Sequence, residues 1–217
     1  MRLPSWLIEA IAPANSERYW DLRFRSNWEA RNGRLQTALF AAGFVIATQG
    51  LLPDDEIGSI IDYGCGCGES LPVLAMRFPK AALWYYDFSP AAMRRATKYY
   101  GSMASAYEPT SARKFDLVYC SNVIEHVADL HAFVASLENL AARYVTILAP
   151  YEERHFDGAP LAPDRKKEEH IRTITTNSLD DARGIRWHTK IMSVPYAWPH
   201  GPQILFLGEK DGNVATK

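Results

Sequence analysis

Three glycines alternate with two cysteines directly after an apolar run, in the stretch IIDYGCGCGES at residues 60–70. Gly64, Gly66 and Gly68 can adopt positive φ angles, and they let a ligand approach the backbone where a Cβ would block it. In an open α/β sheet, ligands bind beyond the carboxyl ends of the strands, where this stretch is expected to lie. A tight strand-to-helix turn without a ligand is the simpler alternative, and the turn alone does not decide between the two.

A second acid follows at the spacing typical of a nucleoside-binding site. Asp87 ends the apolar run ALWYYD, 19 residues after Gly68. An acid about 20 residues beyond such a turn can accept hydrogen bonds from both ribose hydroxyls. Asp87 could instead cap a helix that begins at Pro90, but together with the glycine turn it favours an adenosine-type ligand.

The glycine spacing argues against a dinucleotide. The dinucleotide fingerprint is G-x-G-x-x-G, and here Glu69 stands at the third glycine position. Asp62 adds a carboxylate at the start of the turn, where it would repel a phosphate and attract a cationic amino group or a sulfonium. The stretch therefore favours a cationic ligand bearing an adenosine.

Composition limits the class of protein. With 217 residues, 47% of them hydrophobic, the chain can bury one core and fits one domain with additions. The net charge is −1, so nucleic acid is not an expected partner. The most apolar run, residues 37–48, is shorter than the roughly 20 residues that span a bilayer, so it predicts a buried helix and no membrane insertion.

The N-terminus and the cysteines indicate a cytoplasmic protein. The first 20 residues have no apolar segment and cleavage site of the secretory type. The three cysteines form no even disulfide framework, which suits a reducing compartment. A zinc site from Cys65, Cys67, Cys120 and His126 is conceivable, although a single residue between the first two cysteines is unlike the usual zinc knuckles.

Alternating short apolar runs and helical patterns from residue 57 onward predict a doubly wound α/β fold with a seven-stranded, mostly parallel sheet. The expected strands are 59–63, 82–87, 105–108, 115–121, 144–149, 185–194 and 203–208. The expected helices are 69–77, 90–100, 129–142 and 175–182. Only a short proline-rich stretch separates the last two strands, so the last strand should be antiparallel.

Both ends of the chain depart from this alternation. Residues 1–56 are expected to form an N-terminal helical extension, whose aromatic residues Tyr19, Trp20 and Trp28 either close over a site as a lid or pack as ordinary core. Residues 57–210 would form the main domain. Residues 211–217 are expected to be a flexible tail.

Taken together, these stretches resemble the class I S-adenosylmethionine-dependent methyltransferase family. IIDYGCGCGES is similar to its first motif, YYDFSPAAMRRA to its second, FDLVYCSNVIEHV to its fourth-strand segment and YVTILAP to its fifth strand. The four motifs occur in order between residues 57 and 150. EEHIRTITTNSL is similar to a further segment of members that act on small molecules. The resemblance implies a Rossmann-like fold and S-adenosyl-L-methionine as cofactor.

The resemblance also implies roles for individual residues. The turn and Asp62 would hold the methionine end of the cofactor, Asp87 the ribose, and Phe88 with Met93 the adenine, while the residues after the fourth strand would line the methyl group. The implied cofactor-binding residues are Asp62, Gly64, Cys65, Gly66, Gly68, Asp87, Phe88, Met93, Ser121, Asn122 and Val123. The Gly-Asp pair of many relatives after the third strand is absent, so Glu108 or a backbone group would contact the adenine amino group.

The implied reaction is transfer of a methyl group to a small or medium metabolite, such as a sugar or a biosynthetic intermediate, by direct displacement. His126 is the candidate catalytic base for an oxygen acceptor, and the alternative is that His126 and Glu125 bond to local backbone. His155, Asp157 and His170 could form a metal site or be plain surface residues, and we expect no metal.

Two other functions remain open at this point. A nicotinamide (NAD)-dependent oxidoreductase would bind a dinucleotide in the same turn, and a non-catalytic binding module would keep the fold without the reaction. The residues do not specify the acceptor, the accepting atom or the oligomeric state.

Overall fold

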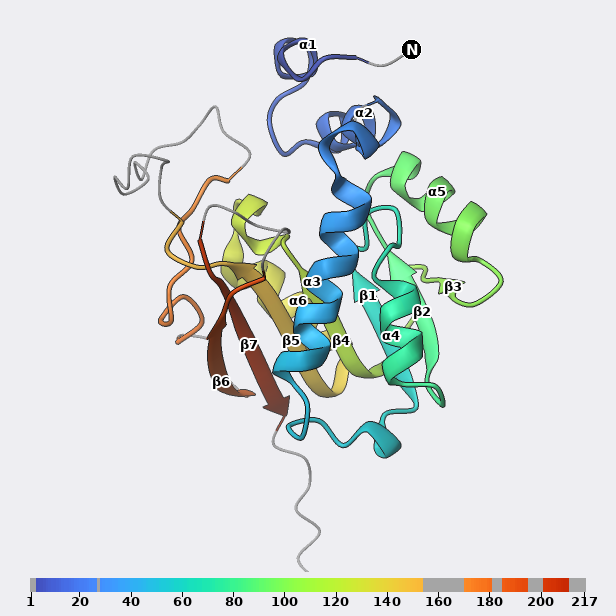
Figure 1. Ribbon diagram of the computed structural model, residues 1–217, viewed down its shortest axis with the longest axis vertical. Helices are drawn as coiled ribbons and strands as arrows, with labels where there is room; N and C mark the ends of the chain where they lie inside the picture. Colours follow the sequence, from blue (N-terminus) through green and yellow to red (C-terminus); the bar gives the residue numbers. More distant parts are fainter. Residues whose placement is uncertain (1–2, 27, 154–169, 181–184, 195–200, 211–217) are drawn as a thin grey trace, which may run out of the picture.

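The computed structural model describes residues 3–26, 28–153, 170–180, 185–194 and 201–210. Its centre is a seven-stranded sheet of order β3-β2-β1-β4-β5-β7-β6, shown in Figure 1. The strands are β1 (Ser59–Tyr63), β2 (Ala82–Tyr86), β3 (Ser105–Ala106), β4 (Phe115–Ser121), β5 (Ala141–Pro150), β6 (Ile185–Met192) and β7 (Gln203–Lys210). The helices are α1 (Ser5–Ile11), α2 (Glu17–Ser26), α3 (Gly33–Ala47), α4 (Leu71–Arg77), α5 (Pro90–Tyr100) and α6 (Leu130–Leu140), with 3-10 turns η1 (Glu29–Arg31), η2 (Asp54–Glu56) and η3 (Ile124–His126).

The sheet is parallel from β3 to β5 and antiparallel at its last two pairings. β1 pairs in parallel with β2 and β4, and β4 with β5. β7 runs antiparallel to both β5 and β6 and lies between them. The predicted fold, a mostly parallel seven-stranded sheet with an antiparallel last strand, is confirmed. Because the parallel strands end at one edge, the loops that follow β1, β2 and β4 meet there.

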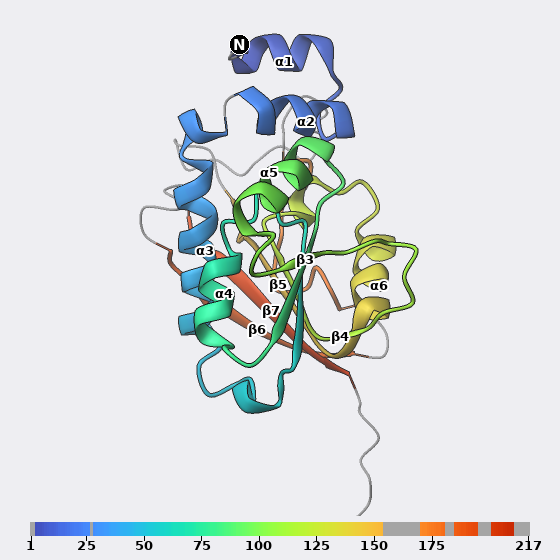
Figure 2. The same cartoon turned by 90° about the vertical axis from the view of Figure 1, so that its right-hand side faces the viewer.

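Helices cover both faces of this sheet, as Figure 2 shows with α3 and α4 on one side and α6 on the other. Phe40 and Phe44 of α3 pack with Leu74 of α4 in one core cluster, and Val134 and Leu137 of α6 belong to a second. α6 begins as the sequence predicts, because the Asp129 carboxylate accepts a hydrogen bond from the Ala132 N–H at 3.0 Å. The sheet is therefore covered by a core layer on each face.

The N-terminal helices add a layer beyond the carboxyl edge of the sheet. α1 and α2 lie past that edge in Figure 1, and α2 packs against α5. The run at residues 37–48 does form a helix, but α3 is buried on one face only, since Ile46 is 72% exposed. Among the described residues, no helix is both long and apolar enough to cross a bilayer.

One predicted helix is wrong over the residues that the structure describes. Residues 176–180 form turns, and 181 and 182 lie outside the described part. The Ser178 hydroxyl accepts a hydrogen bond from the Thr175 N–H at 2.9 Å. Threonine, serine and asparagine side chains in this segment compete with the backbone for such bonds and disfavour a helix. The expected tail, residues 211–217, also lies outside the described part.

Candidate cofactor and acceptor site

A cavity of about 870 Å³ lies at the carboxyl edge of the sheet, between the strand loops and the N-terminal helices. The turn after β1, the end of β2 and the loop after β4 line it from below, and α2 lines it from the opposite side. Predicted site residues that line this cavity are Gly64, Cys65, Gly66, Asp87, Phe88, Ser121, Asn122, Val123 and His126. The structure therefore brings together residues from three separate stretches of the sequence.

The glycine turn has the backbone conformation that the sequence predicts. Gly64, Gly66 and Gly68 have φ angles of 82°, 56° and 88°. The N–H groups of Gly64 and Cys65 both donate to the Tyr86 carbonyl, at 2.8 and 3.0 Å, which joins the turn to the end of β2. A Cβ on Gly64 would lie 2.5 Å from Val123 Cγ2, so the turn also packs tightly against the loop after β4.

Gly68 serves a different purpose from the other two glycines. It does not line the cavity, and a Cβ there would lie 2.8 Å from the Tyr100 ring and 3.3 Å from Ala96. Both of these residues belong to α5. Gly68 therefore allows the turn to pack closely against α5.

Asp87 is buried at the end of β2 and is bonded to the turn. Its carboxylate accepts hydrogen bonds from the N–H groups of Gly66 and Ser89, each at 2.9 Å. Burial away from water raises the pKa of Asp87 to about 7, against the lowering effect of those two N–H donors. Asp87 thus connects the glycine turn to the start of α5 and also faces the cavity.

Asp62 and Met93 lie behind the cavity wall. Asp62 is 2% exposed and accepts a hydrogen bond from the Ser70 hydroxyl, and burial raises its pKa to about 7. The Met93 sulfur accepts a hydrogen bond from the Asp87 N–H at 3.2 Å. Neither side chain lines the cavity in this structure, and Glu108, the candidate adenine contact, is exposed and does not line it either.

Aromatic side chains of the N-terminal segment also line the cavity, and one of them packs against the glycine turn. Trp20, Phe24 and Trp28 line it, and the Phe24 ring would lie 3.3 Å from a Cβ on Gly66. Tyr19 is fully buried and packs with α1. Of the three aromatic residues that the sequence analysis named, Trp20 and Trp28 therefore face the cavity, whereas Tyr19 belongs to the core.

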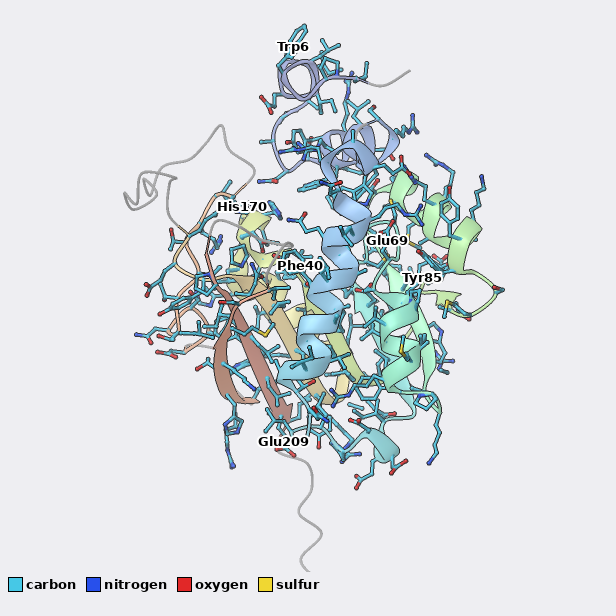
Figure 3. All side chains as sticks on the ribbon, in the orientation of Figure 1. Trp6, Phe40, Glu69, Tyr85, His170 and Glu209 are labelled. Atoms are coloured by element: carbon cyan, nitrogen blue, oxygen red, sulfur yellow. The ribbon has the colours of Figure 1, made fainter. Side chains whose placement is uncertain are left out.

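His126 lines the cavity in a group of ring and carboxylate side chains. Its imidazole contacts Trp20 and His170, with ring centroids 4.9 and 4.8 Å apart. Glu125 is 1% exposed, and burial raises its pKa to about 7. Figure 3 places His170 near the end of the sheet that faces α2, away from Glu209 at the opposite end.

The residue patterns named His170 as a possible metal ligand and Glu125 as a neighbour of His126, but they did not predict that these residues lie together. The Ile171 N–H donates to the Glu125 carbonyl at 2.9 Å, which places the 170–171 segment beside η3. The adjacent Glu-His pair was visible in the sequence, but its proximity to His170 depends on how the chain returns after β5. His155 and Asp157, the other residues of the predicted loop site, lie outside the described residues.

The cysteines are buried free thiols. Burial raises the pKa values of Cys65 and Cys120 well above the usual range for a thiol, so both stay protonated. In the described part of the chain, the side chains grouped closely enough to hold a metal are Glu125, His126 and His170, without a cysteine. The cysteine-based zinc alternative is therefore not supported.

The sheet order, the glycine turn and the buried acid after β2 are those of a Rossmann-like nucleoside-binding domain. A methyltransferase-domain family matches residues 32–183, most of the chain. This protein belongs to the class I S-adenosylmethionine-dependent methyltransferase family, as the sequence motifs predicted. Family membership favours a methyltransferase and its cofactor over the nicotinamide-dependent alternative.

Named relatives agree with this family. The chain is 26% identical over 160 residues to trans-aconitate 2-methyltransferase of Paracidovorax citrulli, covering 66% of this chain and 55% of the relative. It is 36% identical over 94 residues to the protein of the same name from Methylobacterium radiotolerans, covering 42% and 34%. The chain thus spans about half the length of the first curated relative and about a third of the second.

Solved methyltransferases share the fold. The plantazolicin methyltransferase BpumL in complex with SAH has a TM-score of 0.63 at 15% identity, covering 94% of this chain and 95% of its own. Magnesium protoporphyrin IX methyltransferase from Synechocystis with bound SAH has a TM-score of 0.57 at 15% identity, covering 81% and 84%. At these identities the likeness is one of fold.

Proposed function

We propose that this protein transfers a methyl group from S-adenosyl-L-methionine to a small or medium-sized metabolite. The observation that carries the proposal is one cavity that is lined by the glycine turn, by Asp87 and by His126. A bound cofactor and an acceptor would share this space, so that a nucleophile could approach the methyl group in line with its bond to sulfur.

In this proposal the turn and Asp87 bind the cofactor. The backbone at Gly64 and Gly66 would lie against its methionine end, and the Asp87 carboxylate would accept its ribose hydroxyls. Asp62 would support the turn from behind through its bond to Ser70. Phe88 would contact the adenine, with Met93 held beneath Asp87, and Ser121, Asn122 and Val123 would face the methyl group.

The cofactor supplies a methyl group already activated by positive sulfur, so the protein must orient the acceptor and exclude water. Within residues 1–56, the part that precedes α3 would act as a lid, because Trp20, Phe24 and Trp28 line the cavity, whereas α3 packs in the core. His126 would take a proton from an oxygen acceptor as a general base. A direct displacement of this kind needs no covalent enzyme intermediate.

A small acceptor fits a cavity of about 870 Å³ that also has to hold the cofactor. Both curated relatives are named for methyl transfer to trans-aconitate, a small acid. Sugars and other biosynthetic intermediates are of similar size and offer oxygen acceptors. The net charge of −1 gives no attraction to nucleic acid, and the free buried cysteines support a cytoplasmic location.

Calorimetry with SAH tests the cofactor assignment. The Asp87→Asn variant keeps the size of the side chain but loses its charge, and should bind SAH more weakly by about 1.5–3 kcal/mol. Asp55→Asn, which changes an exposed acid far from the cavity, should bind as the wild type does. Tight binding of NAD⁺ with no binding of SAH would refute the proposal.

The catalytic role of His126 needs a separate measurement. His126→Ala should lower kcat by roughly 10²–10⁴-fold while leaving SAH affinity near that of the wild type, because a base acts on the acceptor in the transition state. A variant with a lowered Tm and normal turnover would show that His126 only braces the loop.

A further inference from the structure

Glu125, His126 and His170 form a group whose chemistry the proposed methyl transfer does not fully use. Their candidate ligand atoms all lie within 4.8 Å of one another. Glu125 and His126 belong to η3, directly after β4, whereas His170 comes from a segment far along the chain. The hydrogen bond from the Ile171 N–H to the Glu125 carbonyl fixes the two segments side by side.

Glu125 is the unusual member of the group. It is 1% exposed, and neither carboxylate oxygen has a hydrogen-bond partner among the described residues. His126 Nε2 lies 3.9 Å from its Oε1, which is too far for a hydrogen bond. A buried carboxyl without partners is costly, so its retention next to two imidazoles indicates a ligand that the protein alone does not supply.

His170 is oriented as a metal-binding histidine would be. Its Nδ1 lies 2.6 Å from Glu153 Oε2, so Glu153 can accept the Nδ1 proton. That pairing makes Nε2 the nitrogen that would bind an ion. Metal-binding histidines usually donate their other ring N–H to such a carboxylate, which fixes the tautomer and raises the basicity of the ligand.

We propose that Glu125, His126 and His170 bind a divalent transition-metal ion such as Zn²⁺ at the acceptor end of the cavity. Two imidazoles and one carboxylate are a known ligand set for ions of this class, and they leave coordination positions open. In a tetrahedral zinc site the ligand atoms are about 3.4 Å apart, so the present separations need only small side-chain rotations. All three side chains line the cavity, so the open positions would face the acceptor.

An ion there would change how the acceptor is activated. An acceptor oxygen in an open position would have its pKa lowered by the positive charge of the ion. His126 would then bind the ion, and the positive charge of the ion, in place of a free imidazole base, would promote loss of the proton from the acceptor. This catalytic role rests on the proposed methyl transfer, whereas the metal site itself does not.

The test is Zn²⁺ binding to the metal-stripped full-length chain, by equilibrium dialysis with Zn²⁺ alone. The wild type should bind one equivalent. Glu125→Gln and His170→Ala should each weaken binding more than about 100-fold, and Glu153→Gln by roughly 10–100-fold, because it only orients His170. His131→Ala, an exposed histidine on α6, should bind as the wild type does.

Co²⁺ in place of Zn²⁺ gives a visible spectrum that reports the ligands, and its bands should be lost in His170→Ala. SAH affinity and Tm, measured on every variant, identify those that fail to fold and test the cofactor assignment separately. Absent Zn²⁺ binding in the wild type, or equal affinity in the wild type and in a folded Glu125→Gln or His170→Ala variant, would overturn the metal site without affecting the proposed function.

Discussion

Asp87 combines two properties that are in tension within one side chain. It lines the cavity, where in the proposed function it accepts ribose hydroxyls, and burial raises the pKa of its carboxyl to about 7. In the protein without cofactor, the charged form is supported by the N–H groups of Gly66 and Ser89. Ligand hydroxyls that donate to the carboxylate would stabilise its charged form and lower this pKa.

This raised pKa predicts a pH-dependent stability. The pKa of Asp87 is about 3.9 in the unfolded chain, so between about pH 4 and 7 the folded protein binds a proton that the unfolded chain does not. The stability from the protonated form is complete below about pH 4 and is lost as pH rises through about 7. Without cofactor, the Tm of Asp87→Asn relative to wild type should therefore rise between about pH 5 and 8.

Thermal unfolding of both proteins across this range checks the prediction. Asp55→Asn is the control, because Asp55 is exposed and Lys80 lowers its pKa, so its variant should show no such rise. A Tm difference between Asp87→Asn and wild type that stays constant with pH would contradict the assigned protonation.

Gly64 offers a second test at the scale of one residue. Gly64→Ala places a Cβ 2.5 Å from Val123 Cγ2 at a φ of 82°, whereas Gly50→Ala meets nothing within 4 Å at a φ of 74°. Both variants carry the cost of the left-handed conformation, about 1–2 kcal/mol. Gly64→Ala should lose about 1–3 kcal/mol more in urea unfolding, because its neighbours must move. Equal losses would mean that the turn is not packed as described.

At the scale of elements, the attachment of α2 to α5 decides whether the cavity is closed. Asp21 accepts hydrogen bonds from the Ala91 N–H at 2.6 Å and the Ser89 hydroxyl at 3.2 Å. Arg95 of α5 in turn donates to the Phe24 carbonyl at 2.7 Å. The start of α5 therefore holds the helix that carries Trp20 and Phe24 over the cavity.

Asp21→Ala should loosen this attachment. The loss of a helix N-terminal acceptor costs about 0.5–2 kcal/mol of stability. SAH affinity should fall as well, because α2 would be less well held over the cavity. Glu9→Ala, which removes an exposed acid from the neighbouring helix α1, is the control and should change neither. If Asp21→Ala lowers the free energy of unfolding but leaves SAH affinity unchanged, α2 is not part of the cofactor site.

For the whole molecule, the cavity lies where two layers meet, and the hydrogen bonds between α2 and α5 also join these layers. The strand loops form one wall, and the N-terminal helices form the other. A ligand that contacts both walls should stabilise both against local opening, because either wall would have to open before the ligand could leave.

Hydrogen exchange with and without SAH measures this coupling. Amides of α2 and of the turn at Gly64–Gly68 should both exchange more slowly when SAH is present, and β6, which lies at the far edge of the sheet, should not change. Protection confined to the turn would show that the N-terminal helices do not take part in binding.

The features that could be predicted from the sequence are those set by residues close together in the chain or by successive elements. The glycine turn, Asp87, the cap at Asp129 and the order of strands were readable in the sequence, because backbone conformation, helix periodicity and crossover rules act within a few residues or between successive elements. The helix predicted at 175–182 is wrong over residues 175–180 because its apolar spacing is helical but its hydroxyl and amide side chains compete for the backbone hydrogen bonds of a helix.

Other features depended on the tertiary structure. Asp62 pairs with Ser70, Met93 lies behind Asp87, and Trp20 faces His126, although none of these contacts follows from spacing. Their positions depend on how helices pack across the sheet and how loops return, so segments far apart in the chain become neighbours only when the core has formed. The sequence alone determined the fold and the conformation of the glycine turn, whereas the packing of α2 and of the 170–171 segment decided which side chains line the cavity beside His126.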